Sequence, residues 1–197
     1  MTRYAADHKQ ATRRRMVDAA ARRFKTDGFD GSGVATLVAD AGLTNGAFYG
    51  HFASKDALIA EVVAAEMAIQ AEQIEALPLG HDSLLAFVAA YLSPQHRDDR
   101  AGGCPSAALL DEVSRGDAAT REAYTTGAGR IVDATVRHLT ADQSVDREEA
   151  WSRAVGVLTL MVGAMQSARA VTDRVLSDRI LAAAFSQVRI LVAGDGR

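Results

Sequence analysis

The sequence is poor in cysteine, in proline and in long apolar runs. Cys104 is the only cysteine among 197 residues, which excludes an intrachain disulfide and fits a reducing cytoplasm. No run of about 20 apolar residues occurs, so we expect no segment that spans a membrane. The first residues also lack the apolar stretch of a secretion signal. We therefore expect a cytoplasmic protein without a membrane partner.

Catalytic and metal-binding patterns are missing as well. The five histidines do not cluster with carboxylates or with the cysteine at a spacing that suits a metal site or a catalytic triad. Gly31-Ser32-Gly33 is too short to form a phosphate-binding loop. We expect no metal, no cofactor and no enzymatic activity.

Charge is distributed unevenly, although the net charge is only −3. Residues 1–60 hold nine Lys/Arg against six Asp/Glu, or +3, whereas residues 61–197 hold 13 against 19, or −6. A basic end on an acidic body is the asymmetry expected of a DNA-binding head joined to a separate ligand or partner domain. A solvated basic arm would give the same charges, so charge alone leaves both interpretations open.

Apolar residues recur with helical spacing nearly throughout, and no alternating strand pattern occurs, so we predict an all-α fold. About nine helices are expected, over 9–27, 34–41, 45–52, 55–77, 81–93, 105–115, 118–139, 147–172 and 178–193, with a polar loop over 95–103. In the helix over 55–77, Leu58, Val62 and Ile69 are expected to form the buried stripe.

The stretch 28–58 is the most informative part of the chain. Two short helices joined by a turn at Gly42 match a helix-turn-helix, because glycine can take a positive φ there without a Cβ clash. Leu43 can then fill the space between the two helices, and Thr44 can cap the second one.

The second of these helices has two different faces. Phe48 and Phe52 are four residues apart and are expected to pack inward, while Asn45 and Tyr49 are expected to face outward beside glycines. An exposed ridge of this kind suits a helix that approaches DNA closely, since hydroxyls donate to phosphates and asparagine can read adenine edges.

Two further residues of the stretch are compatible with DNA. Lys55 at a helix N-terminus is unfavourable for the helix dipole unless a phosphate lies nearby. His51 is expected either to donate to a phosphate or to brace the turn from inside. Arg13, Arg14 and Arg15 in the basic first helix are either further phosphate contacts or a solvated helix start.

These residues resemble the signature of the TetR family of transcriptional regulators. The matching positions are Gly28-Phe29, Val34, Leu37, Ala41-Gly42-Leu43-Thr44, Gly46, Phe48-Tyr49, His51-Phe52 and Ser54-Lys55-Asp56-Ala57-Leu58. The positions that depart from the signature are Gly33, Val38, Ala47 and Gly50.

The resemblance implies a repressor that a small-molecule effector releases from a palindromic operator in double-stranded DNA. It implies a DNA-binding domain over 1–56, with the helix-turn-helix at about 33–52, and a ligand-binding and dimerisation domain over 57–197. The implied DNA contacts are Thr44, Asn45, Gly46, Ala47, Tyr49, His51 and Lys55. Among these, the hydroxyls and the lysine are expected on phosphates and 45–47 near base edges.

The C-terminal part is expected to dimerise and to bind the effector. Residues 154–165 are apolar on almost every face of a helix, which predicts burial on all sides, in a monomer core or against another subunit. The resemblance implies a homodimer through the last two helices. The candidate lining residues of the effector pocket, each of which could also be plain core, are Phe87, Tyr91, Cys104, Leu109, Tyr124, Trp151, Met161 and Met165.

Two alternatives stay open at this point. Cys104 precedes a helix N-terminus and is either a redox or electrophile sensor or an inert buried thiol. The chain as a whole could be a helical enzyme or an interaction module that does not bind DNA. An interaction module that does not bind DNA would leave Gly42, Tyr49 and Lys55 at these spacings unexplained.

Overall fold

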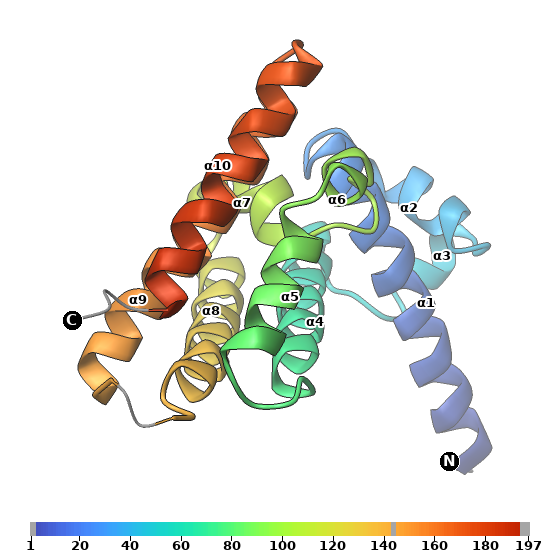
Figure 1. Ribbon diagram of the computed structural model, residues 1–197. Helices are drawn as coiled ribbons and strands as arrows, with labels where there is room; N and C mark the ends of the chain where they lie inside the picture. Colours follow the sequence, from blue (N-terminus) through green and yellow to red (C-terminus); the bar gives the residue numbers. More distant parts are fainter. Residues whose placement is uncertain (1–2, 143–144, 194–197) are drawn as a thin grey trace.

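The computed structural model describes residues 3–142 and 145–193, which form ten α-helices and no strand (Figure 1). The prediction of an all-α fold is thus confirmed. The helices are α1 (Arg3–Asp27), α2 (Val34–Asp40), α3 (Asn45–Phe48), α4 (Lys55–Glu75), α5 (His81–Tyr91), α6 (Pro94–Asp98), α7 (Pro105–Arg115), α8 (Ala118–Leu139), α9 (Arg147–Ala170) and α10 (Arg174–Ala193).

Local side-chain bonds explain several helix starts. Ser54, Asp117 and Asp146 each accept a hydrogen bond from the backbone N–H three residues later, which satisfies a donor that the first turn leaves unpaired. These caps place the starts of α4, α8 and α9 where the sequence predicted them.

Several predicted boundaries were wrong: α1 begins at Arg3 rather than at Lys9, and α3 ends at Phe48 rather than at Phe52. Residues 94–98 form a short helix rather than a loop, because Ser93 accepts a bond from the His96 N–H and Pro94 suits the first turn. The last helix begins at Arg174, where the Asp173 carboxylate accepts from the N–H of Val175 at 2.8 Å. Ser177, predicted as its cap, lies buried inside the helix.

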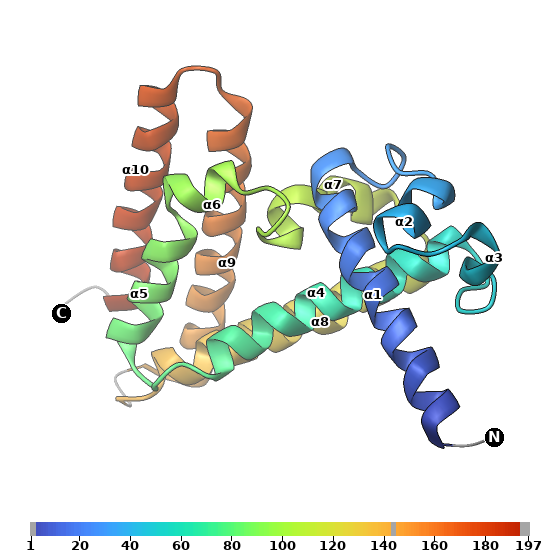
Figure 2. The same ribbon diagram turned by 90° about the vertical axis from the view of Figure 1, so that its right-hand side faces the viewer.

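The helices form an elongated body with different elements at its two ends. Figure 2 shows α1, α2 and α3 at one end and the pair α9 and α10 at the other, with α4 and α8 running lengthwise between them. α4 and α8 pack closely along each other, and a Cβ at Gly127 of α8 would lie 2.3 Å from the Met67 Cβ of α4. Only glycine permits this approach at position 127.

The core consists of two clusters. One holds Phe24, Phe48 and Met67 and extends from α1 along α4 as far as Ile74, with parts of α7 and α8, while the other holds Leu139 and Met165 and lies mainly among α5, α8, α9 and α10. The predicted buried stripe of α4 was wrong in one position: Ile69 is exposed, and Met67, Ala71 and Ile74 are buried instead. Phe87 and Leu158 pack against both clusters and therefore connect them.

The sequence predicted no segment that spans a membrane. Among the described residues, no helix has the length and apolar character needed to cross a bilayer.

Candidate DNA-binding surface and effector cavity

The turn between α2 and α3 has the geometry of a helix-turn-helix. Gly42 has a φ of +67°, as the sequence predicted, and the Leu43 N–H donates to the Val38 carbonyl at 2.8 Å. Leu43 is half-buried and packs against the core. Thr44 occupies the N-cap position of α3, but its side chain makes no capping hydrogen bond.

The face of α3 that points away from the core carries most of the predicted DNA-contacting side chains. Tyr49 is 71% exposed, and Thr44, Asn45 and Gly46 are exposed as well. Ala47 is half-buried and packs against the core, so its methyl group is partly turned away from that face.

Aromatic packing fixes α3 from inside. Phe48 and Phe52 are fully buried, with ring centroids 5.7 Å apart, and Tyr49 meets Phe48 edge to face at 5.2 Å. The exposed tyrosine is therefore held by its neighbour and does not depend on a solvent-facing contact for its position.

Arg13 of α1 braces this unit internally. Its guanidinium donates to the Glu61 carboxylate and to the His51 carbonyl, and it lies 4.1 Å from the centroid of the Phe52 ring. Arg15 donates to the Ala41 carbonyl at 2.6 Å, whereas Arg14 is exposed. Arg13 and Arg15 thus hydrogen-bond to the protein rather than forming a merely solvated helix start, and for Arg14 both interpretations remain.

His51 and Lys55 both follow α3, the second helix of the helix-turn-helix and hence its recognition helix. Burial, followed by the charges of Lys9 and Arg13, lowers the pKa of His51, so its imidazole is neutral at neutral pH. Its Nδ1 is buried without a hydrogen-bond partner among the described residues. Lys55 is half-buried in the first turn of α4.

Buried and half-buried ion pairs fasten α1 to the rest of the DNA-binding end. Lys25 pairs with Glu66 of α4 at 2.6 Å, and the Lys25 side chain is only 5% exposed. Arg23 pairs with Asp40 of α2 at 2.8 Å. These pairs, together with Arg13 and Glu61, hold α2 and α4 in a fixed orientation against α1.

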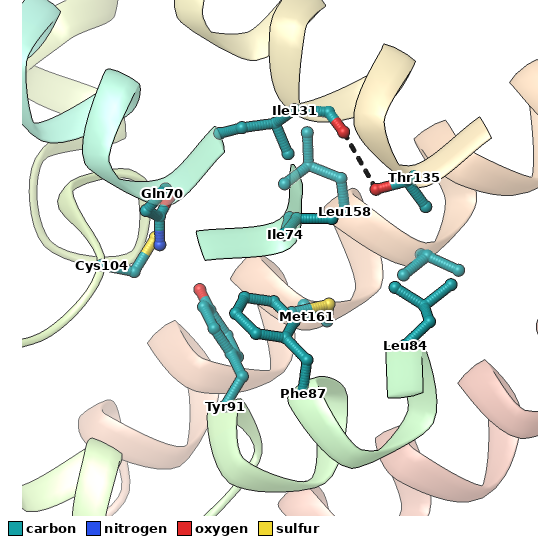
Figure 3. A pocket seen from close by; sticks show the side chains of 11 residues that line it. Gln70, Ile74, Leu84, Phe87, Tyr91, Cys104, Ile131, Thr135, Leu158 and Met161 are labelled. Atoms are coloured by element: carbon teal, nitrogen blue, oxygen red, sulfur yellow. Dashed lines mark hydrogen bonds between the residues drawn. The ribbon is translucent and has the colours of Figure 1, made fainter. Parts of the chain in front are cut away.

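A cavity lies at the other end of α4, where the two core clusters meet (Figure 3). It is lined by Gln70, Ile74, Leu84, Phe87, Tyr91, Cys104, Ile131, Thr135, Val157, Leu158 and Met161. Its volume is about 20 Å³, which is room for a single water molecule. A wider depression of about 210 Å³ lies beside it and shares Gln70, Phe87, Tyr91 and Cys104 with it.

Four of the predicted pocket residues line this cavity, namely Phe87, Tyr91, Cys104 and Met161. The structure places the other four elsewhere. Leu109 and Met165 are plain core, the Tyr124 hydroxyl donates to Ser106 at 3.2 Å, and Trp151 is 55% exposed on α9. Hydrophobicity alone could not separate these residues, because core and cavity walls share the same composition.

Gln70 and Thr135 are polar lining residues that the sequence analysis missed. Gln70 sits on α4 one position after the exposed Ile69, on a helix whose apolar pattern is that of a plain core element. A glutamine so close to the buried positions Met67 and Ala71 was the available signal.

His96 connects the backbone of Tyr91 with that of Cys104 at the entrance to the cavity. His96 Nδ1 lies 2.7 Å from the Tyr91 carbonyl, and His96 Nε2 accepts from the Cys104 backbone N–H at 3.0 Å. Burial lowers the pKa of His96, which keeps the imidazole neutral with one donor and one acceptor nitrogen. The Cys104 thiol donates to the Gln70 Oε1 at 3.3 Å.

Helix α7 connects the cavity with the DNA-binding end. It begins directly after Cys104 at the cavity wall, and its Glu112 accepts from the Phe29 backbone N–H at 3.0 Å. Phe29 follows Gly28, which ends α1 with a φ of +79°. Glu112 thus satisfies a backbone donor just beyond the helix that carries Arg13 and Lys25.

The comparisons with known proteins agree with this geometry. Residues 16–62 match the family model described as bacterial regulatory proteins, tetR family. This segment runs from the middle of α1 into α4 and contains every predicted DNA contact. No curated protein matches the sequence.

Solved structures with the same fold cover nearly the whole chain. The reduced form of NemR from E. coli is 22% identical, with a TM-score of 0.75 over 90% of this chain and 95% of that one. A TetR-family regulator from Cytophaga hutchinsonii is 21% identical, with a TM-score of 0.76 over 95% and 96%. FadR from Bacillus subtilis in complex with stearoyl-CoA is 17% identical, with a TM-score of 0.63 over 92% and 98%.

Proposed function

We propose that the chain is a TetR-type regulator, a DNA-binding and ligand-responsive transcriptional repressor released from a palindromic operator by a small molecule. The single observation that carries the proposal is Tyr49. It stands 71% exposed on a short helix whose opposite face is locked in the core. A solvated surface gains nothing from such a residue, whereas a DNA phosphate provides an acceptor for its hydroxyl.

The DNA-binding domain is proposed to comprise residues 1–56, and residues 57–197 are proposed to bind the effector and to dimerise. In this arrangement Thr44, Tyr49 and Lys55 donate to phosphates, and Asn45 and Gly46 lie near base edges. Ala47 and His51, which are both half-buried, would contact DNA only at the margin of this surface.

A homodimer through α9 and α10 follows from the two-fold symmetry of a palindromic operator. Both helices keep exposed residues in rows that suit helix packing: Trp151, Thr159 and Gly163 on α9, and Leu176 and Ile190 on α10. A Cβ at Gly163 would meet nothing within 4 Å in the single chain, so the close approach that this glycine permits is unused there.

The effector is proposed to bind at the cavity and to act through α7. FadR holds stearoyl-CoA on a similar fold, which supports a ligand site in the helical body. An effector can release the operator only if it binds one of two dimer states more tightly. The Glu112 bond to Phe29 is the direct link by which a shift of α7 reaches the DNA-binding end. We propose no catalytic activity and a cytoplasmic location.

Operator binding tests the function. DNA sites selected from a random-sequence pool by the purified protein should be palindromic and bound in a salt-dependent manner. Lys55→Ala and Tyr49→Phe should weaken binding to all selected sites, and Lys55→Ala should lower the salt slope by about one. Asn45→Ala should relax base preference at one position instead.

Arg137→Ala is the matched control for Lys55→Ala, because Arg137 is exposed near the C-terminal end of α8, away from α3 and outside the proposed interface. A pool that yields no salt-sensitive site would exclude the proposal. Equal losses in Arg137→Ala and Lys55→Ala would show that general charge, rather than the helix-turn-helix, binds the DNA.

The subunit interface has its own matched pair. Gly163 and Gly129 are both helical, and a Cβ at either would meet nothing within 4 Å in the single chain. Gly163→Trp should yield monomers in analytical ultracentrifugation, while Gly129→Trp on α8 should stay dimeric. Dimers in both variants would exclude this face of α9 as the interface.

A further inference from the structure

The cavity has a polar end built by three side chains from three elements. Figure 3 shows Gln70 of α4, Tyr91 of α5 and Cys104 grouped on one side of the cavity, with Leu84 and Thr135 on the other side. The Cys104 thiol donates to Gln70 Oε1, which leaves the Gln70 amide N–H groups as donors.

Tyr91 provides the observation that points to a ligand. Its side chain is 8% exposed, and its hydroxyl makes no hydrogen bond of normal geometry among the described residues, although the Cys104 thiol lies near it. Burial raises the pKa of this phenol well above its usual range, so the hydroxyl keeps its proton and acts as a donor. A buried hydroxyl without a partner destabilises the free protein, and such groups are uncommon outside functional sites.

The charge around this polar end selects against cationic ligands. Arg169 lies behind it and donates to the carbonyls of His96 and Arg97, which carry no full negative charge. Its Nη1 is buried without a partner among the described residues. The positive charge favours a ligand atom with negative partial charge next to Tyr91, and it disfavours an ammonium group.

The apolar remainder of the cavity selects against ions of either sign. Among the residues that the structure describes, no charged side chain lines it, and the Thr135 hydroxyl donates to the Ile131 carbonyl at 2.9 Å. Burying a carboxylate here would leave it without a direct cationic partner. The body of the ligand must therefore be uncharged and mainly apolar.

The cavity must also open before a ligand fits. Its volume of about 20 Å³ is far below the ~150 Å³ that accommodates benzene in an engineered cavity. The side chains between the cavity and the outer depression are Phe87, Tyr91, Gln70 and Cys104. Displacing Phe87, which connects the two core clusters, would join the two spaces.

Resting on the proposed function, we infer that the effector is a small, uncharged, mainly apolar molecule with one carbonyl oxygen. The oxygen accepts hydrogen bonds from the Tyr91 hydroxyl and the Gln70 amide, and the apolar body takes the place that Phe87 vacates. The closed cavity of the free protein then corresponds to the state that the effector disfavours, because only the opened state holds it.

Four small probes of similar size test this inference. Acetophenone, ethylbenzene, 1-phenylethylamine and benzoate carry a carbonyl, a methylene, an ammonium and a carboxylate on the same ring. We expect acetophenone to bind the purified protein about tenfold more tightly than ethylbenzene in NMR titrations, which is the effect of one good hydrogen bond. The charged probes should bind more weakly than either.

Tyr91→Phe should reduce the preference for acetophenone over ethylbenzene severalfold, to what the Gln70 amide alone contributes. Tyr124→Phe is the matched control, because the Tyr124 hydroxyl is bonded to Ser106 and lines neither space. It should leave the preference unchanged. Tyr91→Phe should also raise the Tm of the ligand-free protein, since it removes an unpartnered buried hydroxyl. Tighter ketone binding with a higher Tm in the same variant would contradict the inference.

Other results would overturn the inference without touching the proposed function. These are an unchanged preference in Tyr91→Phe, tighter binding of the amine or of benzoate, or no saturable binding of acetophenone. Operator binding by the same preparations reports separately on the proposed function. A protein that selects palindromic DNA but rejects acetophenone remains a repressor with a different effector.

Discussion

The two ends of this molecule satisfy their buried polar groups to different degrees. At the DNA-binding end, cations meet carboxylates: the buried Lys25 pairs with Glu66, and the half-buried Arg13 pairs with Glu61. At the cavity end, Tyr91 and Arg169 keep buried polar atoms without partners among the described residues. The first end leaves only His51 Nδ1 in this condition among the described residues, whereas the second leaves two groups that a ligand could pair.

This difference indicates where stability and response reside. A closed network of ion pairs fixes one orientation, because breaking any pair leaves a charge buried alone. Buried donors without partners lower the stability of the free protein, and a ligand that pairs with them raises it again. The predictions below test whether the two ends differ in this sense.

The largest effect is expected at the DNA-binding end. Lys25→Met should lower the free energy of unfolding by about 3–5 kcal/mol, because it leaves the Glu66 carboxylate buried without its cation. Urea unfolding measures this loss. Lys25→Met combined with Glu66→Leu should recover most of it, since neither charge is then left alone. A single variant as stable as the wild type would remove the contrast between the two ends.

The connection between the ends should respond next most strongly. Gly127→Ala should destabilise the protein by about 1–3 kcal/mol, because its Cβ would meet the Met67 Cβ at 2.3 Å and force α4 and α8 apart. Gly129→Ala on the same helix should stabilise it by about 0.5–1 kcal/mol, since space is open there. Chemical denaturation of the two variants side by side compares them. Changes of the same sign would mean that the α4–α8 contact is not tight.

The link through α7 should give a smaller and more local effect. Glu112→Ala should cost about 0.5–1.5 kcal/mol, because the Phe29 backbone N–H loses the acceptor of one hydrogen bond. Hydrogen exchange should accelerate around Phe29 and leave the cavity helices unchanged. Glu112→Gln keeps an acceptor oxygen and should restore most of the protection. Faster exchange across the whole chain would show that Glu112 supports the global fold rather than this link.

The smallest effect is a dependence on pH to which each end contributes one histidine. Burial lowers the pKa of both His51 and His96, so the unfolded chain binds these protons more readily than the folded one. The associated stability is present above the unfolded pKa of 6.5 and is lost as the pH falls through the lower folded values. Unfolding free energies between pH 7 and 5 should therefore decline. His51→Gln and His96→Gln should each flatten part of that decline, and a slope unchanged in both variants would assign it to other groups.

The same two ends differ in how far the sequence predicted them. The helix-turn-helix follows from neighbouring residues: Gly42 has to adopt a positive φ, and the spacing of Phe48 and Phe52 decides which face is exposed. The cavity combines residues that lie far apart in the chain, from Gln70 to Met161. Their pattern is that of any buried helix, so the sequence could name candidates but not tell Tyr91 from Tyr124.

Bracing interactions were missed for a similar reason. Arg13 was expected to be solvated or bound to phosphate because basic residues near a helix start usually are, and only the fold brings Glu61 and the Phe52 ring beside it. The helix over 94–98 was missed because it is a single turn, too short to show a period.

The contact of Gly127 with Met67 also has a mechanical consequence, because α4 is one continuous rod that extends to both sides of it. At 1.5 Å per residue, Lys55 lies about 18 Å from this contact and Gln70 only about 4.5 Å on the other side. If α4 tilts about that contact, the displacement at Lys55 is roughly four times the displacement at Gln70. A small displacement of α4 beside the cavity would therefore become a larger displacement at the start of α4, next to the recognition helix. That larger displacement would change how the recognition helix fits on DNA.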